Sequence, residues 1–323
     1  MEKNISERDF SRIINEYFNS IRCYSNQFPK STGLLTLDEI SQLLEGMDKD
    51  YESFRLFSWN IDWNKRKPND LLEEKFNLIK KFEPDIVVLQ ECKYYDCLRL
   101  KNEFKYFHWY GDGRDSDLGI GIFSDIWNIE LSSSHSYITP FRYVVPYLLS
   151  KGDIKISIFS IWTKDKIHKE LSDGKIYVDE FYNLEYVNNI LSAIDYYKKL
   201  LKRHVILIGD FNSADTEKNR YLAHSNLLKK LETYKIFNCT KLPKYKYSND
   251  FEFLPTFFMN YELNKGVVDD YCFISQDNNY SNNITNISVG IPEKWIKKYS
   301  DHVPLMIRIM IKKNKSPTSY NKR

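Results

Sequence analysis

The sequence predicts an α/β protein whose sheets are covered by helices, and three observations support this prediction. From about residue 53 onward, apolar runs of strand length alternate with longer amphipathic runs of helical length. The chain has 323 residues and is 42% hydrophobic, which is enough for a large buried core. Only 11 Gly and 10 Pro occur beside 28% charged residues, which excludes disordered, collagen-like and low-complexity proteins.

Residues 1–50 are expected to form a helical extension that is separate from the main domain. A first helix is predicted by apolar residues at helical spacing, which need burial: Phe10, Ile13, Ile14 and Phe18. A second helix is predicted from Thr36, which makes a capping-box pattern with Glu39. We expect the extension to pack on the main domain, to mediate self-association or to bind a partner protein.

The main domain is expected to span residues 51–311. Short apolar runs predict seven strands in it, at 54–58, 86–89, 120–123, 154–161, 205–208, 270–274 and 303–310. A helix is predicted after Asp70, with one apolar face. A longer helix is predicted from about 179 to 203, because its acidic start and basic end suit the helix dipole. Residues 312–323 are polar and basic and are expected to form a flexible tail.

The charge distribution and the cysteines say more about the cellular compartment of the protein than about its binding partner. The formal net charge of +3 divides into −3 for residues 1–50, +1 for 51–310 and +5 for 311–323. This distribution permits a polyanionic partner without requiring one. The five cysteines are odd in number and include no Cys-x-x-Cys pair, which favours reduced thiols. Because the sequence shows neither a membrane span nor an apolar secretory leader, a cytoplasmic protein is expected.

Acidic and carboxamide side chains gather at the ends of five predicted strands. A single acid at a strand end is usually a solvated loop residue or a helix cap. Five such ends on one chain favour a shared site instead. They are Ser58-Trp59-Asn60-Ile61-Asp62, Leu89-Gln90-Glu91, Gly209-Asp210-Phe211-Asn212, Asp269-Asp270-Tyr271 and Ser300-Asp301-His302.

Four of these side chains form a ligand set that contains oxygen and no sulfur. Asn60, Asp62, Glu91 and Asp301 supply hard ligands, which suit Mg²⁺ or Mn²⁺ and not zinc. Such a cation keeps part of its water shell and also binds the phosphate oxygens of a substrate. The sequence therefore predicts Mg²⁺ or Mn²⁺ as the cofactor.

The other polar residues at the strand ends indicate the chemistry. Asp270 can accept a hydrogen bond from His302 and fix its tautomer. Asp210 can orient or deprotonate a water, and Asn212 can donate to a phosphoryl oxygen without adding negative charge. With a cation, these four candidate catalytic residues predict phosphoester hydrolysis by in-line attack of water.

The order and spacing of these motifs resemble the endonuclease/exonuclease/phosphatase superfamily, which includes DNase I and exonuclease III. The resemblance covers roughly residues 53–311 and includes Gly209-Asp210-Phe211-Asn212-Ser213 and Ser300-Asp301-His302-Val303-Pro304. It implies a four-layer α/β/β/α sandwich of two mostly antiparallel sheets flanked by helices. It also implies a divalent cation held by Glu91, with Asn60, Asp62 or Asp301 nearby. The segments Gly119–Phe123 and Pro255-Thr256 look like the corresponding segments of a bacterial subgroup of this superfamily.

The sequence departs from that superfamily at the end of the central strand, where many members have His and others Tyr. Trp162 stands there, and its indole N–H can donate a hydrogen bond but cannot act as a general acid. Trp162 can bind a phosphate or stack on a base, with Lys164 and Arg142 supplying positive charge. The alternatives are core packing for Trp162 and solvated or structural roles for the two cations. Three aromatic residues have the same two alternatives of base stacking and packing: Phe257, Phe258 and Tyr261.

We expect a divalent-metal-dependent phosphodiesterase that acts as a nuclease on DNA, with RNA as a second possible substrate. The Asn60-Ile61-Asp62 start and the basic–aromatic loops favour this hypothesis. One alternative is a phosphatase or phosphodiesterase for an inositol phosphate, a nucleotide or a lipid headgroup, because a fold does not fix a substrate. A second alternative is a non-catalytic binding protein on the same fold.

Overall fold

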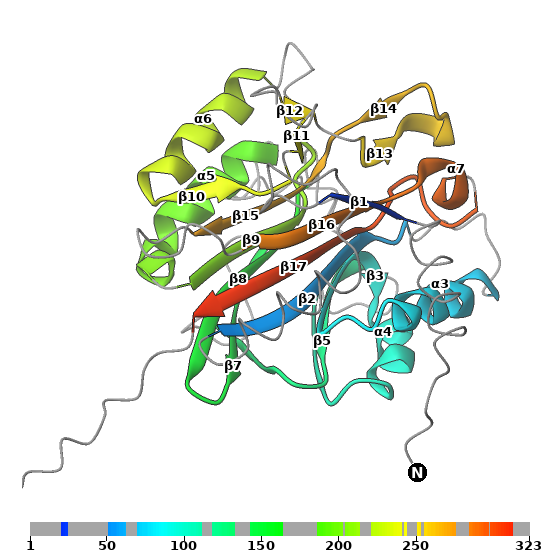
Figure 1. The fold of residues 1–323 in the computed structure, drawn as a ribbon, viewed down its shortest axis with the longest axis horizontal. Helices are drawn as coiled ribbons and strands as arrows, with labels where there is room; N and C mark the ends of the chain where they lie inside the picture. Colours follow the sequence, from blue (N-terminus) through cyan, green and yellow to red (C-terminus); the bar gives the residue numbers. More distant parts are fainter. Residues whose placement is uncertain are drawn as a thin grey trace, which may run out of the picture.

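The computed structural model describes most of the main domain and four residues of the predicted extension (Figure 1). The described residues are 21–24, 51–62, 70–111, 118–132, 143–163, 186–202, 204–213, 221–240, 242–243, 251–252, 255–275, 284–296 and 298–312. They form two main sheets and two short hairpins, together with flanking helices. No helix among them is long and apolar enough to span a bilayer.

The first sheet has seven strands and one parallel pair. Its order is β1 (Ile21–Tyr24), β16 (Ile284–Gly290), β17 (Leu305–Lys312), β2 (Tyr51–Asn60), β3 (Ile86–Lys93), β5 (Leu118–Ser124) and β4 (Tyr106–Tyr110). Only β2 and β3 run parallel, and α3 (Asp70–Lys81) connects them. The connection through α3 returns the chain to the edge of the sheet at which β2 begins. β2 and β3 therefore run in the same direction, and their carboxyl ends lie side by side.

The second sheet repeats this arrangement with six strands. Its order is β10 (Ile236–Asn238), β15 (Asp270–Ser275), β9 (His204–Asp210), β8 (Ile154–Trp162), β7 (Val144–Lys151) and β6 (Asn128–Leu131). Here β8 and β9 form the parallel pair, and α5 (Tyr186–Tyr196) lies between them in the chain. The short hairpins pair β11 (Leu242–Pro243) with β12 (Phe251–Glu252) and β13 (Phe257–Phe258) with β14 (Gly266–Val267).

The two sheets pack face to face, and helices cover their outer faces. One apolar cluster joins β2, β3 and β17 of the first sheet to β8 and β9 of the second, and it includes the buried face of α3. A second cluster lies between the outer face of the second sheet and the helices α5 and α6 (Tyr221–Thr233). The remaining helical elements are α4 (Tyr94–Lys101), α7 (Pro292–Trp295), η1 (Lys198–Lys202) and η2 (Met259–Tyr261). These layers confirm the predicted α/β sandwich (Figure 1).

All seven predicted strands are present, with adjusted ends. The last strand starts at Leu305 because Pro304 cannot donate a ladder hydrogen bond. The helix predicted over 179–203 is shorter, since α5 ends at Tyr196 and a 3₁₀ helix follows; residues 179–185 lie outside the described residues. Within the predicted extension, Ile21–Tyr24 is a strand that pairs with β16. The helices predicted around Phe10–Phe18 and from Thr36 lie outside the described residues, as does the tail after Lys312.

Candidate active site

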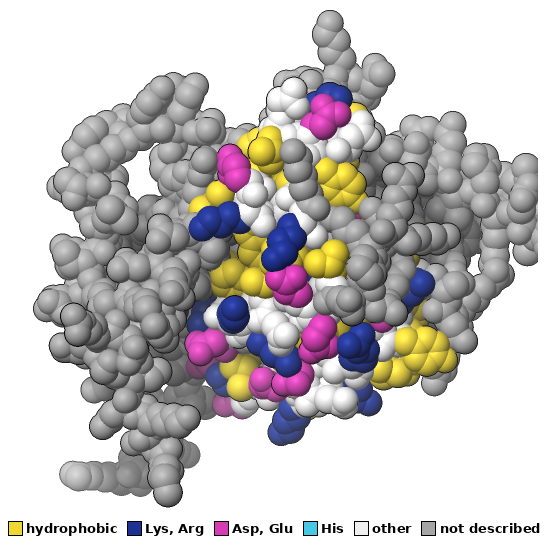
Figure 2. All heavy atoms as spheres, turned by 90° about the vertical axis from the view of Figure 1, so that its right-hand side faces the viewer, with side chains coloured by type: hydrophobic (Ala, Val, Ile, Leu, Met, Phe, Trp, Pro, Cys, Tyr) yellow, Lys and Arg dark blue, Asp and Glu magenta, His cyan; other side chains and the backbone are white. Residues whose placement is uncertain are grey.

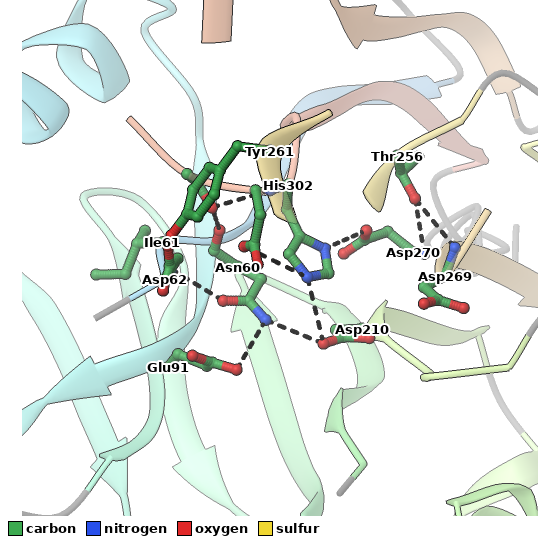
Figure 3. Close-up of polar contacts among 12 residues, drawn as sticks. Asn60, Ile61, Asp62, Glu91, Asp210, Thr256, Tyr261, Asp269, Asp270 and His302 are labelled. Carbon is green, nitrogen blue, oxygen red and sulfur yellow. Dashed lines mark hydrogen bonds and ion pairs between the residues drawn. The ribbon is translucent and has the colours of Figure 1, made fainter. Parts of the chain in front are cut away.

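The site lies where the carboxyl ends of the two parallel strand pairs converge. Asn60 ends β2 of the first sheet, and Asp210 ends β9 of the second. Asn60 Nδ2 donates to Asp210 Oδ2 over 3.0 Å, so one hydrogen bond joins the facing sheets (Figure 3). Asp270 starts β15 and is directly paired with Asp210 in the ladder. The fold therefore brings three separate chain segments to one place.

Asn60 organises the part of the site with the predicted metal ligands. Its Nδ2 also donates to Glu91 Oε1 over 3.3 Å, and its Oδ1 accepts from the Asp62 backbone N–H over 3.0 Å. Asp62 and Glu91 have left-handed backbone torsions, with φ of 43° and 52°. Left-handed torsions are uncommon for residues other than glycine and are often found at functional sites. The backbone thus departs from strand geometry where these two acids project.

A buried lysine supports this same segment from behind. Lys75 of α3 donates through Nζ to the Ile61 carbonyl and, over 3.4 Å, to the Asp62 carbonyl. Its ammonium also lies 5.8 Å from the centre of the Trp59 ring. Because a buried ammonium needs hydrogen-bond acceptors, Lys75 fixes the backbone that carries Asp62. A lysine on a predicted helix normally faces solvent, so the sequence carries no signal for this role of Lys75.

His302 is held in a fixed orientation within the site. Its Nδ1 lies 2.8 Å from Asp270 Oδ2, and the ring is buried. Its backbone N–H donates to Ser300 Oγ over 3.0 Å, and its carbonyl accepts from Trp59 Nε1 over 3.0 Å. With Nδ1 engaged by Asp270, Nε2 faces Asp210 Oδ2 at 3.9 Å and Asp301 Oδ1 at 4.0 Å (Figure 3). These two separations exceed hydrogen-bond distance, so Nε2 remains available for a further hydrogen-bond partner.

Asp210 is fixed on both of its carboxylate oxygens. Oδ2 accepts from Asn60, and Oδ1 accepts the backbone N–H and the side-chain amide of Asn212, each over 2.9 Å. The amide of Asn212 also donates to the Thr163 carbonyl over 2.7 Å. In this structure Asn212 therefore orients Asp210, and both amide hydrogens are used within the protein. Its predicted role as a donor to phosphate stays a prediction.

Burial and neighbouring charges shift the protonation of three site residues. Burial raises the pKa of Asp210 well above its usual range, although the charge of His302 opposes the shift. Burial alone would lower the pKa of His302, but the Asp270 carboxylate and then Asp210 and Asp301 outweigh it and raise that pKa well above its usual range. Burial raises the pKa of Asp301 to about 6, with Asp62 and Glu91 adding to the shift and His302 opposing it. A charged imidazole thus faces carboxylates that are poorly solvated.

The donor set fits a cation that keeps much of its own water. No group of three or more His, Cys, Asp or Glu side chains in the described part of the chain is arranged to hold a metal ion. A closed cage of the zinc type is therefore not formed by these residues. Mg²⁺ and similar ions instead bind through one or two carboxylates and retain waters. The mutual repulsion of Asp301, Asp62 and Glu91 is the electrostatic setting that such a cation would relieve.

The predicted substrate-binding residues have different outcomes. Trp162 is only 1% exposed and packs edge-on against Tyr143, with ring centroids 5.1 Å apart. This burial corrects the substrate-binding interpretation of Trp162, because its ring is covered by the core and favours the packing alternative. Lys164 and Arg142 lie outside the described residues. Phe258 is buried, whereas the partly exposed ring of Phe257 lies 4.8 Å from the ring of His302.

Two further residues, Thr256 and Tyr261, hold parts of the site in place. Thr256 Oγ1 accepts the backbone N–H groups of Asp269 and Asp270, over 3.1 and 3.0 Å, and so holds the start of β15. Tyr261 donates its hydroxyl to Asp62 Oδ2 (Figure 3). The Pro255-Thr256 dipeptide was a family signal without a role. For Tyr261 the sequence predicts base stacking or packing, and its contact with Asp62 escapes prediction because it joins residues 199 positions apart.

Comparisons with solved structures agree with the fold. No curated protein matches the chain. Solved structures of the same fold include truncated TDP2 from Caenorhabditis elegans, with 14% identity, a TM-score of 0.52 and coverage of 80% of this chain and 98% of that one. The 3′ phosphatase NExo from Neisseria bound to a product DNA hairpin has 14% identity, a TM-score of 0.53 and coverage of 79% and 98%. TDP2 from D. rerio with a single-strand DNA product has 13% identity, a TM-score of 0.52 and coverage of 80% and 99%.

The family assignment rests on the match to a family model. The model of the Endonuclease/Exonuclease/phosphatase family matches residues 57–302, which include every predicted ligand and catalytic residue of the site. Hydrolysis of phosphoester bonds is the kind of reaction that this family name describes. The chain belongs to the Endonuclease/Exonuclease/phosphatase family.

Proposed function

We propose that the protein is a Mg²⁺- or Mn²⁺-dependent phosphodiesterase that hydrolyses DNA, with RNA as a second substrate, by in-line attack of a water molecule. One observation carries the proposal. Asp210 and the charged His302–Asp270 pair lie buried beside Asn60 and Glu91, so a proton acceptor, a proton donor and oxygen ligands share one site. A purely structural cluster would not need to keep charges under this degree of burial.

Each residue has a role that its contacts support. Glu91 and Asn60, with Asp62 and Asp301, would hold the cation, which when bound offsets negative charge on the phosphate. Asp210 accepts the proton of the attacking water, and its raised pKa suits a proton acceptor. His302 donates from Nε2 to the phosphate or to the departing oxygen, and Asp270 keeps the imidazole charged and oriented. The attacking water thus gives its proton to Asp210, and the departing oxygen receives a proton from His302 Nε2.

Support for DNA as the substrate comes from the local aromatic surface and from structures of the same fold. Phe257 lies against His302 and is partly exposed, so a base can stack near the reacting phosphate. Two of the similar structures hold DNA products. The face that bears α3 and α7 adds no support for DNA, since positive and negative side chains are interspersed among its described residues (Figure 2).

Cleavage assays with a matched control test the proposal. Labelled single- and double-stranded DNA and RNA are incubated with the full chain in Mg²⁺, in Mn²⁺ and in chelator. Asp210→Ala should reduce cleavage by about 10²–10⁴-fold, the usual contribution of a positioned acid or base. Asp195→Ala is the control, because Asp195 lies on α5 with a 59% exposed side chain. Cleavage that persists undiminished in Asp210→Ala would overturn the assignment.

The same assays separate the proposed nuclease from its alternatives. Hydrolysis of inositol phosphates, nucleotides or lipid headgroups without cleavage of DNA or RNA would favour the small-molecule phosphatase. Failure to bind Mg²⁺ or Mn²⁺ in calorimetry would favour a non-catalytic binding protein. The cytoplasmic location and the partner-binding role of residues 1–50 stay predictions, and deleting residues 1–20 tests the latter through oligomeric state, thermal stability and activity.

A further inference from the structure

Tyr261 brings a phenol hydroxyl to the metal-binding part of the site from a distant element. It ends η2, between β13 and β14, and its hydroxyl donates to Asp62 Oδ2 (Figure 3). The ring is partly buried and packs against the apolar cluster between the sheets. The hydroxyl is therefore fixed at the site by the packing of its own ring.

The segment that carries Tyr261 is also tied to the other part of the site. The Phe258 backbone N–H donates to the Asp301 carbonyl over 2.8 Å, and Phe257 forms a β-bridge with His302. The chain from Phe257 to Tyr261 therefore contacts both the His302 segment and Asp62. Contacts at both ends set the position of the hydroxyl relative to the whole site, unlike a loop that is anchored at one end only.

The backbone of this turn is strained at the residues that aim the hydroxyl. Asn260 and Tyr261 have φ of 56° and 59°, in the left-handed region. Asparagine tolerates this region, but for a bulky residue such as tyrosine it is a genuine outlier. Asp62, the acceptor, is itself left-handed with φ of 43°. Strain of this kind persists only where surrounding contacts enforce it, and it clusters at functional sites.

We propose that Tyr261 is a positioning residue of the metal site. Its hydroxyl donates a hydrogen bond to Asp62 Oδ2 and thereby presents the other oxygen of Asp62 to the cation. Hydrogen bonds from a second layer of residues orient the carboxylates that bind metals. This inference rests on the proposed function, because it requires that Asp62 binds the cation.

Calorimetry of Mn²⁺ binding to the full chain without substrate tests the inference. Tyr261→Phe removes one oxygen atom and keeps the ring that packs against the core. It should weaken Mn²⁺ binding by about tenfold or more, the usual effect of losing such a second-layer partner. Cleavage by this variant should fall at low Mn²⁺ and return toward the wild-type rate as Mn²⁺ is raised, since Tyr261 acts through the cation site. Tyr196→Phe is the matched control, because Tyr196 is 55% exposed on α5.

A double-mutant cycle with Asp62→Asn decides whether Tyr261 acts through Asp62. The Tyr261→Phe change should alter Mn²⁺ affinity less than twofold when Asp62 is already Asn. Wild-type affinity in Tyr261→Phe, or the same loss in Tyr196→Phe, would overturn the inference while leaving the proposed function intact. A wild-type chain that binds no Mn²⁺ would reject the proposed function and this inference together. Thermal melts of all variants identify any loss that comes from unfolding.

Discussion

Replacing Asp270 by Asn tests the electrostatics of the site directly. Asp270 Oδ2 lies 2.8 Å from His302 Nδ1, and the two side chains are 3% and 7% exposed. The change Asp270→Asn keeps the size and an acceptor oxygen but removes the charge that faces the imidazole. The consequence should appear both in the free energy of unfolding and in its dependence on pH.

The expected loss of stability follows from what His302 can do after the change. Removing one partner of a buried pair costs about 3–5 kcal/mol if the other charge stays buried. His302 can instead lose its proton more readily, because burial lowers its pKa and only Asp210 and Asp301 then oppose that effect. The cost then falls toward that of one charge-assisted hydrogen bond, about 1.5–3 kcal/mol at pH 7.

The pH dependence of stability should become weaker. In the wild type the folded pKa of His302 is raised, so its stabilisation is fully present below the unfolded value of about 6.5 and is lost as the pH rises through the folded pKa. In Asp270→Asn the largest raising effect is removed while Asp210 and Asp301 still oppose burial, so the folded pKa should lie closer to the unfolded value. The stabilisation that His302 loses as the pH rises above about 6.5 should therefore be smaller than in the wild type.

Urea unfolding followed by tryptophan fluorescence between pH 5 and pH 9 measures these effects. Asp153→Asn is the matched control, since Asp153 is exposed in the turn between β7 and β8. The catalytic rate of Asp270→Asn should fall by about 10⁴-fold, as when the carboxylate behind a catalytic histidine becomes an amide. Parallel stability curves for the wild type and Asp270→Asn, or equal effects of Asp153→Asn, would refute the reasoning.

Two further predictions concern Asp301 and Gly209, the residue of β9 that precedes Asp210. Burial raises the pKa of Asp301 to about 6, so the cation-free protein should lose stability as the pH rises from about 4 to about 6, since the folded state holds the proton longer. Melting curves of the wild type and Asp301→Asn across this pH range check the prediction, and the variant should show a smaller loss of stability. The affinity for Mn²⁺ should fall as the pH drops below about 6. Gly209 has φ of 136°, and a Cβ there would lie 2.0 Å from the Ile161 carbonyl oxygen, so Gly209→Ala should cost at least about 3 kcal/mol or prevent folding. Gly152→Ala, with φ of 56° and no atom within 4 Å, should cost only about 1–2 kcal/mol in the same unfolding assay; equal losses would contradict the steric argument.

Several elements escaped prediction because their sequence signals are weak or conflicting. Pro146 in β7 favours a prediction of no strand, because proline has no backbone N–H to donate. Pro146 lies next to the part of β7 that pairs with β6 and outside it, so its missing N–H removes no hydrogen bond to β6. In β4, every residue is partly exposed, so no alternation of apolar and polar residues marks the strand. β1 gains its strand structure by pairing with β16, across more than 260 residues of sequence.

The grouping of the polar strand ends was predictable because it follows from local pattern. Apolar runs of strand length locate β2, β3, β9 and β15, and the polar residues at their ends must lie at the edges of the sheets. Asn60, Glu91 and Asp210 were expected together on this ground, and the structure brings them within hydrogen-bond distance. The identity of each side chain then limits its chemistry, since carboxylates accept protons or bind hard cations.

The sequence by itself determined the fold class, the strand ends that meet and the reaction chemistry that their side chains permit. Only the tertiary structure decided that Trp162 is core and that Tyr261 reaches Asp62. It also decided that burial raises the pKa of Asp210 and Asp301. The reason is that periodicity and motif spacing report on neighbours along one strand or helix. Burial, long-range hydrogen bonds and pKa values depend instead on which atoms of distant segments fill the space around a group.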